Sequence, residues 1–238
     1  MEDAGVEVVV GVLEKEAYDI NKRFFVNQNY KRPYIILKWA QSADGFIDRV
    51  RELGDGQSAV RLSNDISSAF VHKLRTEVQG IMVGTNTALM DNPKLTSRNW
   101  YGNNPTRIVI DREGKLPSGI SLFDGEVETI LFTENFSSDF ADKRVKSLKI
   151  DFSVNIIPQI LKHLYEEEIY SILVEGGSSL LSSFIEGGYW DEAYVEVAPI
   201  KIGNGVKAPA LDMSKSVTKY YKKSTQYHLK NKITQNIV

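Results

Sequence analysis

The chain contains no cysteine. It can therefore form no disulfide, use no thiol as a nucleophile and build no cysteine-ligated zinc site. Histidine is almost as scarce, because His72, His163 and His228 are the whole supply and lie far apart in the sequence. None has an obvious serine or acidic partner, so we interpret each histidine as structural. We expect no metal site.

The chain also lacks an excess of charge and a long apolar run. Its 238 residues carry 29 basic and 31 acidic side chains, a formal net charge of −2. A chain whose main partner is nucleic acid is usually strongly basic, so we expect no nucleic-acid partner. No apolar run approaches the roughly 20 residues of a membrane span, and the first residues do not resemble a signal peptide. We expect a cytoplasmic protein without a membrane partner.

What the sequence does contain is an alternation of strand and helix patterns, without internal repeats. Nearly continuous apolar runs, typical of strands covered on both faces, occur at Tyr34–Ala40, Gly80–Val83 and Ser171–Glu175. This order predicts an α/β fold with a mostly parallel sheet and a closing antiparallel pair. The other predicted strands are Val6–Val12, Arg107–Asp111, Thr129–Thr133 and Tyr194–Ala198, with two more within Tyr220–Val238. The predicted helices are Glu14–Phe25, one capped by Ser63 or Asn64 that runs to about Gln79, Val154–Glu168 and Leu180–Glu186; Asn27–Pro33 is a predicted linker and Arg51–Val60 a predicted loop.

The segment Gly84–Arg98 is the most informative one. It follows the predicted strand Gly80–Val83 and opens with Gly, Thr and Asn, which suit a helix start. Backbone N–H groups at such a start favour phosphate. Asp91 and Arg98 then bring a carboxylate and a guanidinium close together, a combination that orients polar, phosphorylated small molecules. The segment indicates a nucleotide or sugar-phosphate site.

A second turn, Glu175–Ser179, connects a predicted strand to a predicted helix. Its paired glycines let a backbone approach a pyrophosphate closely, and the helix start supplies N–H donors. The turn is not the Gly-x-Gly-x-x-Gly fingerprint of a standard dinucleotide-binding domain, and an ordinary turn with serine capping gives the same pattern. Glu175 lies at the carboxyl end of its strand, where ligands bind in open α/β sheets.

Three charged residues have both a functional and a structural interpretation. Lys38 interrupts an apolar strand, which is costly unless its ammonium is paired or faces a cleft. An edge position, with the side-chain stem along the apolar surface, explains it equally well. Arg75 lies one turn after Val71 on a predicted helix and fits a solvated face as well as a site. Asp91, before Asn92-Pro93, fits a simple turn or cap.

Four segments in order resemble one family: Lys38–Gly45, Gly84–Arg98, Pro105–Asp111 and Val174–Leu180. They are similar to segments of the reductase domain of the bifunctional riboflavin-biosynthesis deaminase/reductase, a relative of dihydrofolate reductase in fold. The resemblance covers residues 32–238, and residues 1–31 look like a remnant of the deaminase domain plus a linker. The His-x-Glu and Pro-Cys-x-x-Cys deaminase signature is missing. We therefore expect a truncated bifunctional enzyme, or a natural fragment, without deaminase activity.

The resemblance implies NADPH-dependent reduction of the ribosyl group of 5-amino-6-(5-phosphoribosylamino)uracil to the ribitylamino product, by a homodimer. Two alternatives stay open. One is a reductase of the same fold that acts on another pterin or pyrimidine. The other is a catalytically silent nucleotide-binding domain, which two features keep open: the deaminase is missing, and Arg61-Leu62-Ser63 stands where the family usually has tryptophan followed by Ile-Thr or Ile-Ser.

The resemblance also implies roles for individual residues. Lys38 and Glu175 would polarise or protonate the opening sugar, and Asp91 would bind substrate hydroxyls. Arg75 and Arg98 would clamp the phosphate or bracket the pyrimidine. The implied catalytic set is Lys38, Glu175 and Asp91; the substrate-binding set is Ser58, Arg75, Asp91, Leu95, Arg98 and Glu175; and the cofactor-binding set is Ala40, Arg61, Thr87, Thr133, Gly176, Gly177, Ser178, Ser179 and Leu180, with Arg112 a candidate for the 2′-phosphate of NADPH.

Overall fold

Strands and helices alternate along the chain, as the apolar pattern predicts. The computed structural model describes residues 1–135 and 144–231. The helices are η1 (Glu2–Ala4), α1 (Glu14–Tyr30), α2 (Asp65–Thr76), α3 (Thr85–Asp91), η2 (Ser121–Phe123), α4 (Ile156–Glu166) and α5 (Ser178–Glu186). The strands are β1 (Tyr34–Ser42), β2 (Phe46–Asp48), β3 (Gly80–Val83), β4 (Thr106–Ile110), β5 (Thr129–Thr133), β6 (Val145–Lys149), β7 (Ser171–Gly176), β8 (Glu192–Ala198), β9 (Val206–Lys207), β10 (Val217–Tyr221) and β11 (Ser224–Lys230).

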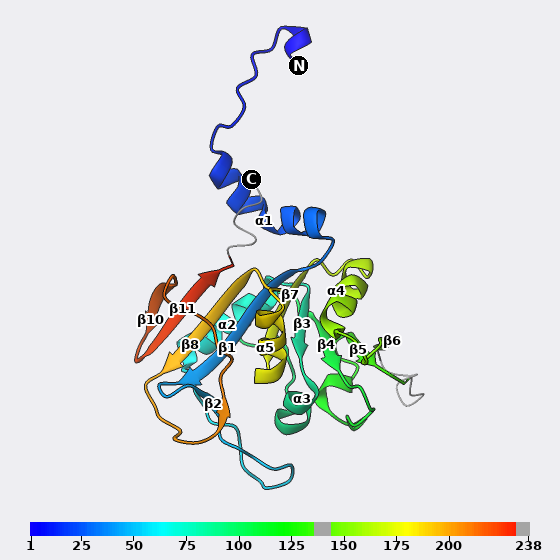
Figure 1. Ribbon diagram of the computed structural model, residues 1–238, viewed down its shortest axis with the longest axis vertical. Coiled ribbons are helices and arrows are strands. Elements are labelled where there is room, and N and C mark those ends of the chain that lie inside the picture. The colour runs from blue at the N-terminus through cyan, green and yellow to red at the C-terminus, as the bar shows by residue number, and fades with distance from the viewer. Residues whose placement is uncertain (136–143, 232–238) are drawn as a thin grey trace.

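Nine of these strands form one sheet with the order β10-β11-β8-β1-β7-β3-β4-β5-β6 (Figure 1). From β8 to β6 in that order, all neighbouring strands run parallel. β11 pairs antiparallel with β8 and with β10. The predicted α/β fold is therefore confirmed, including the antiparallel pair near the C-terminus. Residues 232–238, which we also placed in that pair, lie outside the described residues.

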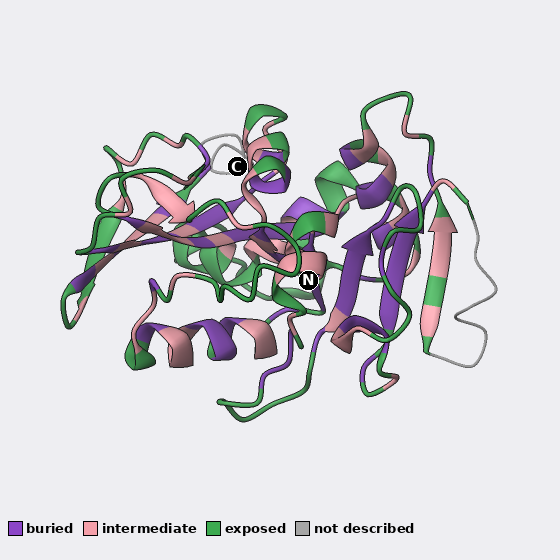
Figure 2. Ribbon diagram, turned by 90° about the horizontal axis from the view of Figure 1, so that it is seen from below, coloured by how far each residue is buried: buried purple, intermediate pink, exposed green. Residues whose placement is uncertain are grey.

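The two faces of the sheet pack against different helices. Alternate residues of β1 point to opposite faces: Ile35 and Leu37 join the core beneath α4 and α5, whereas Ile36 joins the core beneath α1, α2 and α3. Figure 2 shows the central strands buried throughout, while the helices expose one side. The strands between the two layers are apolar on both faces for this reason, and their carboxyl ends all lie at one edge of the sheet.

The N-terminal segment differs from the prediction in two ways. Val6–Val12 is not a strand, because it has no partner strand among the described residues, and its valines are exposed as the segment extends away from the body (Figure 1). The helix that follows runs on to Tyr30, through part of the predicted linker. Asn27 explains the extension, because its side-chain amide donates to the carbonyls of Arg32 and Tyr170 and so belongs to the folded body.

Several predicted elements agree closely with the structure. β5 has the predicted bounds, and α2 begins after Asn64, whose side chain accepts hydrogen bonds from the N–H groups of Ile66 and Ser67 in a capping box. The loop from Arg51 to Val60 is also as predicted. The structure adds β6 at the edge of the large sheet and a small sheet of β2 with β9. The burial patterns of these three short strands carry no clear apolar alternation.

Candidate active site

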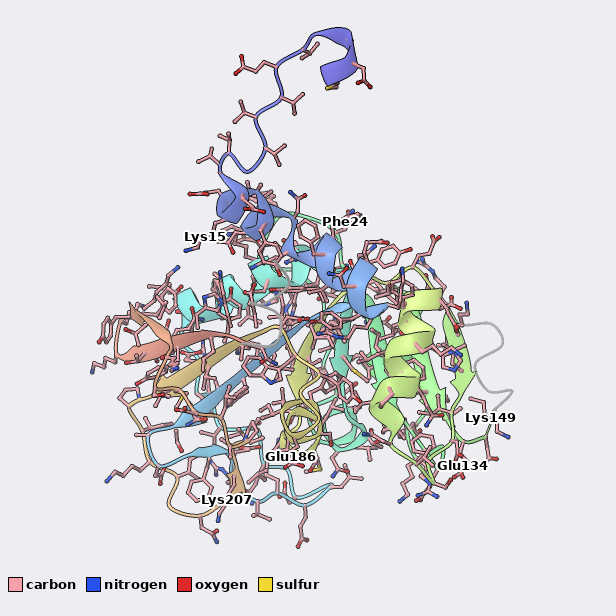
Figure 3. All side chains as sticks on the ribbon, turned by 45° about the horizontal axis from the view of Figure 1, so that its top comes forward. Lys15, Phe24, Glu134, Lys149, Glu186 and Lys207 are labelled. Atoms are coloured by element: carbon pink, nitrogen blue, oxygen red, sulfur yellow. The ribbon has the colours of Figure 1, made fainter. Side chains whose placement is uncertain are left out.

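A cavity of about 940 Å³ opens at the carboxyl ends of β1, β3 and β7. Lys38, Trp39 and Ala40 of β1 line it, together with the turns that follow β3 and β7, the loop after β2 and Val206 of β9. Figure 3 shows Lys207 of β9 at this end of the molecule, and Lys15 and Phe24 of α1 at the other. The cavity lies where ligands bind in open α/β sheets. Among the described residues, no group of histidine and acidic side chains is arranged to hold a metal ion, and no helix is long and apolar enough to cross a membrane.

Lys38 and Glu175 both line this cavity. β1 and β7 are paired in parallel with Leu37 opposite Val174, so Lys38 and Glu175 follow at the next position of adjacent strands. β1 lies inside the sheet between β8 and β7, and the edge-strand interpretation of Lys38 is therefore wrong. Among the described residues, no hydrogen bond to the Lys38 ammonium is found, and its charge faces the cavity unpaired by direct contact.

Arg75 of α2 holds the Glu175 carboxylate through two parallel hydrogen bonds. Nε donates to Oε1 at 2.8 Å and Nη2 donates to Oε2 at 2.6 Å, with side-chain exposures of only 11% and 14%. The third nitrogen, Nη1, donates to the Thr96 carbonyl at 2.8 Å. Three of the five N–H donors of the guanidinium are therefore engaged within the protein, and the expected clamp on the phosphate stays a prediction. A solvated helix face is excluded.

The pKa values of Lys38 and Glu175 are both lowered, but for different reasons. Burial lowers the pKa of Lys38 from its ordinary 10.5, and the nearby charges of Glu175 and Glu196 only partly offset the effect. Burial alone would raise the pKa of Glu175, but the charge and hydrogen bonds of Arg75, with the charge of Lys38, bring it below its ordinary 4.5. The site thus holds an ionised carboxylate beside an ammonium that releases its proton more readily than a lysine in water.

Two glycine-containing turns form the adjoining wall. Gly177 precedes α5 with no side-chain cap, so the first N–H groups of that helix stay available. A Cβ built on Gly177 would meet the Thr87 hydroxyl at 2.9 Å, which shows how closely the two turns approach. The peptide bond between Gly176 and Gly177 is cis. Of the residues expected to bind the cofactor, Ala40, Arg61, Thr87, Gly176, Gly177, Ser178, Ser179 and Leu180 line the cavity.

Asp91 also lines the cavity, and its environment contains a residue that the sequence analysis missed. The Nη2 group of Arg51 donates to Asp91 Oδ1 at 2.5 Å, and Arg51 Nε donates to Asp48 Oδ2 at 2.6 Å. Arg51 belongs to the predicted loop, where a charged residue in a polar segment gives no signal of a buried role. The turn alternative for Asp91 is partly correct, since it is the last residue of α3.

The remaining predicted residues lie outside the cavity lining. Arg98 is exposed, and so is Ser58 in the loop after β2. The Leu95 side chain is buried in the core beneath α2 and α3, so only its backbone remains for a ligand. Thr133 is buried at the end of β5, where its hydroxyl donates to the Asn135 carbonyl. Arg112, the candidate for the 2′-phosphate, is paired with Glu134 at 3.0 Å.

The Ser-x-Asp-Gly part of the first motif has a structural role. The Ser42 hydroxyl donates to Asp44 at 2.6 Å, and the Asp44 carboxylate accepts the N–H groups of Ile202 and Gly203. These hydrogen bonds, led by that from Ser42, lower the pKa of Asp44 to about 2. The motif ties the chain after β1 to the segment before β9 and so shapes one side of the cavity.

The structure gives one histidine an acidic partner and leaves a ring nitrogen of another without a hydrogen bond. His228 Nε2 lies 2.9 Å from Glu192 Oε2, so an acidic partner is present that the sequence does not place beside it. His72 is buried one turn before Arg75, and its Nδ1 is a buried polar atom without a hydrogen-bond partner among the described residues. Burial, with the charges of Arg75 and Arg98, lowers the pKa of His72.

Comparison with known proteins places this arrangement in a family. Residues 33–234 match the RibD C-terminal domain. The chain belongs to the RibD C-terminal domain family. Riboflavin biosynthesis protein RibD of Aquifex aeolicus is 34% identical over 209 residues, which cover 87% of this chain and 57% of that protein. This member of the family thus spans little more than half the length of such curated relatives.

This chain covers a larger share of two further relatives than of RibD of Aquifex aeolicus. The 2,5-diamino-6-ribosylamino-4(3H)-pyrimidinone 5′-phosphate reductase of Methanothermobacter thermautotrophicus is 32% identical over 182 residues, covering 72% of this chain and 80% of that protein. A solved deaminase/5-amino-6-(5-phosphoribosylamino)uracil reductase of Thermotoga maritima superposes with a TM-score of 0.82 at 30% identity, covering 97% of this chain and 65% of that one.

Proposed function

We propose that this chain is an NADPH-dependent reductase that converts the ribosyl group of 5-amino-6-(5-phosphoribosylamino)uracil into a ribityl group in riboflavin biosynthesis. The observation that carries the proposal is the pairing of Lys38 with Glu175 at one position of adjacent strands, beside the glycine turn of α5. Reduction of a sugar requires a proton donor, a group that stabilises positive charge and a site for the dinucleotide. Lys38, Glu175 and the glycine turn are suited to these three tasks.

The chemistry divides into a proton and a hydride. When the sugar ring opens, the bond between C1′ and the ring oxygen breaks, and that oxygen takes up a proton as a Schiff base forms with the exocyclic nitrogen. NADPH, when bound, supplies the hydride that adds to C1′. Lys38 donates the proton, because burial makes its ammonium a better acid, and it regains a proton from water in the open cavity. Glu175 stabilises the positive charge of the Schiff base.

The residues around the cavity suit a dinucleotide. Gly177 lets two turns that line the cavity approach closely, because a Cβ at this position would lie only 2.9 Å from the Thr87 hydroxyl. The uncapped N–H groups at the start of α5 favour an anionic pyrophosphate. Arg61 stands where the family usually has tryptophan; it is 74% exposed at the cavity and paired with Asp65. We assign it to a phosphate of the cofactor in place of an aromatic contact.

The test is oxidation of NADPH by the purified chain, followed by the loss of reduced-nicotinamide absorbance. Turnover with 5-amino-6-(5-phosphoribosylamino)uracil that Glu175→Gln abolishes supports the reductase. Tight NADPH binding without turnover would instead support the catalytically silent domain.

A second substrate belongs in the same assay. The Methanothermobacter relative is named for the diamino pyrimidinone, the compound that has not lost its amino group. Each substrate is given to separate samples at equal concentration. A larger kcat/KM with the diamino compound would identify a reductase that acts before deamination, and a larger value with the uracil compound would support the reaction proposed above.

The assembly and the domain division follow from the family resemblance. We expect a homodimer, and a monomer in sedimentation velocity at micromolar concentration would refute it. The division into a deaminase remnant at residues 1–31 and a reductase unit at residues 32–238 stays a prediction, as does a cytoplasmic location. Limited proteolysis that leaves residues 32–238 folded and active would support the division.

A further inference from the structure

Arg51, in the loop after β2, connects β2 to the end of α3 beside the cavity. Its Nε donates to Asp48 in β2 at 2.6 Å, and its Nη2 donates to Asp91 at the end of α3 at 2.5 Å. Its Nη1 points to the Met90 carbonyl at 3.4 Å. The Arg51 side chain is only 7% exposed although it lies in a surface loop. Ordering a long arginine side chain costs rotamer entropy, and an exposed ion pair offsets little of that cost. The contacts of Arg51 therefore differ from an ordinary surface ion pair.

The end of α3 explains why a cation is needed there. Asp91 is the last residue of this helix, where the helix dipole disfavours an acidic side chain and leaves backbone carbonyls without partners. α3 has no basic residue in its own last turn. Arg51 supplies the missing cation from another element, and its planar guanidinium fixes the direction of the carboxylate as a single charge on a flexible stem would not.

The hydrogen bonds leave one oxygen of Asp91 available. Oδ1 accepts from Arg51, and no partner of Oδ2 is found within residues 1–135 and 144–231. The Asp91 side chain is 35% exposed, and both residues line the cavity. One oxygen is therefore held while the other faces the space where a ligand would bind.

We propose that Arg51 is a positioning residue that fixes the Asp91 carboxylate so that its free oxygen accepts a hydrogen bond from the sugar hydroxyls of the substrate. The inference rests on the proposed function. Asp48 holds Arg51 in place. Its Oδ1 accepts the N–H of Val60 at 2.9 Å and so closes the loop that carries Arg51. A misplacement of about 1 Å in such a group costs roughly 100-fold in rate.

The experiment compares Arg51→Gln, Arg51→Lys, Asp91→Asn and the Arg51→Gln/Asp91→Asn double variant in steady-state kinetics with NADPH and the pyrimidine substrate. We expect Arg51→Gln to lower kcat/KM for the pyrimidine by roughly 10- to 100-fold, with KM for NADPH nearly unchanged. Arg51→Lys should recover part of the loss, since lysine keeps the charge but not the fork. The double variant should be no worse than Asp91→Asn alone, because Arg51 acts through Asp91.

Arg32→Gln is the matched control. Arg32 also holds an aspartate through two hydrogen bonds, to Asp191, but at the start of β8, away from the cavity. It should lower the thermal midpoint while leaving kcat/KM unchanged. If Arg51→Gln does the same, Arg51 is only structural and the proposal is overturned. Losses that multiply in the double variant would overturn it too, because Arg51 would then touch the ligand itself. If Arg51→Gln does not fold, Arg51→Lys decides: kinetics equal to wild type would refute the role.

The kinetics of the wild-type chain distinguish a failure of the proposed reductase activity from a failure of the proposed role of Arg51. A wild-type chain that is folded but does not oxidise NADPH with either pyrimidine overturns the proposed function, and the role of Arg51 with it. A wild-type chain that turns over, with an Arg51→Gln variant that turns over equally well, overturns only the role of Arg51.

Discussion

Replacing Glu175 with glutamine should destabilise the fold as well as stop the reaction. The two charge-assisted hydrogen bonds from Arg75 are 2.8 and 2.6 Å long, between side chains that are 11% and 14% exposed. Removing one partner of a buried pair leaves the other charge uncompensated, at a cost of about 3–5 kcal/mol. Glutamine keeps one acceptor, so we take the lower end, about 3 kcal/mol. For a chain of this size that is a fall of roughly 6–12 °C in the thermal midpoint.

The assay is thermal unfolding of wild type and Glu175→Gln, beside Glu196→Gln as the comparator. Glu196 is more deeply buried than Glu175, but its carboxylate accepts from the hydroxyls of Ser63 and Ser67, which are neutral donors. Glu196→Gln should therefore cost about 1 kcal/mol, or roughly 2–4 °C. Equal midpoints for wild type and Glu175→Gln would refute the reasoning, and so would a larger fall for Glu196→Gln.

The same comparison has a pH dependence with a definite sign. The pKa of Glu175 in the folded chain is below its ordinary 4.5, despite burial, because of Arg75. A carboxyl whose pKa is lowered on folding stabilises the fold fully above its unfolded pKa, and loses that contribution as the pH falls through the folded value. The midpoint difference between wild type and Glu175→Gln should be constant near neutrality and narrow below pH 4.5. A gap that widens on acidification would contradict the assignment.

Three further outcomes follow from the site. Lys38→Met should abolish turnover, because the proton donor is lost. Its thermal midpoint should be no lower than that of wild type, because the change removes a cation whose pKa burial has lowered; a folded, fully active variant would exclude Lys38 as the acid. Gly177→Ala should raise KM for NADPH several-fold and leave the fold intact, because its Cβ would press on the Thr87 hydroxyl, and unchanged cofactor affinity in a titration would contradict this. Asp44→Asn should lower the protection of the Gly203 amide against hydrogen exchange, relative to the intrinsic rate at the same pH, because that N–H loses its charged acceptor; unchanged protection would count against the role of Asp44.

The sequence predicted most of the sheet because the relevant signals are local. β5 and β3 are buried on both faces, and their apolar runs show it directly. α2 begins where Asn64 caps it, and a cap needs only neighbouring residues. The prediction of a strand at Val6–Val12 was wrong because strand formation also depends on a partner that is not local in the sequence. A β-branched run is typical of a strand, but a strand forms only where another strand accepts its hydrogen bonds, and none does among the described residues.

The amino-acid sequence by itself determined the order of elements, the glycine turns and the presence of Lys38, Asp91 and Glu175, since periodicity and motif spacing depend on residues close together in the chain. Tertiary structure decided which of those residues meet. Arg75 and Glu175 are 100 residues apart, and Arg51 and Asp91 are 40 apart, so no local pattern records either pair. The packing of α2 beside the carboxyl end of β7 brings Arg75 to Glu175, and the return of the loop after β2 to the end of α3 brings Arg51 to Asp91. Pairing across such distances depends on the whole fold. It places Arg75 against the Glu175 carboxylate and Arg51 against the Asp91 carboxylate, and the second pair was not predicted from the sequence.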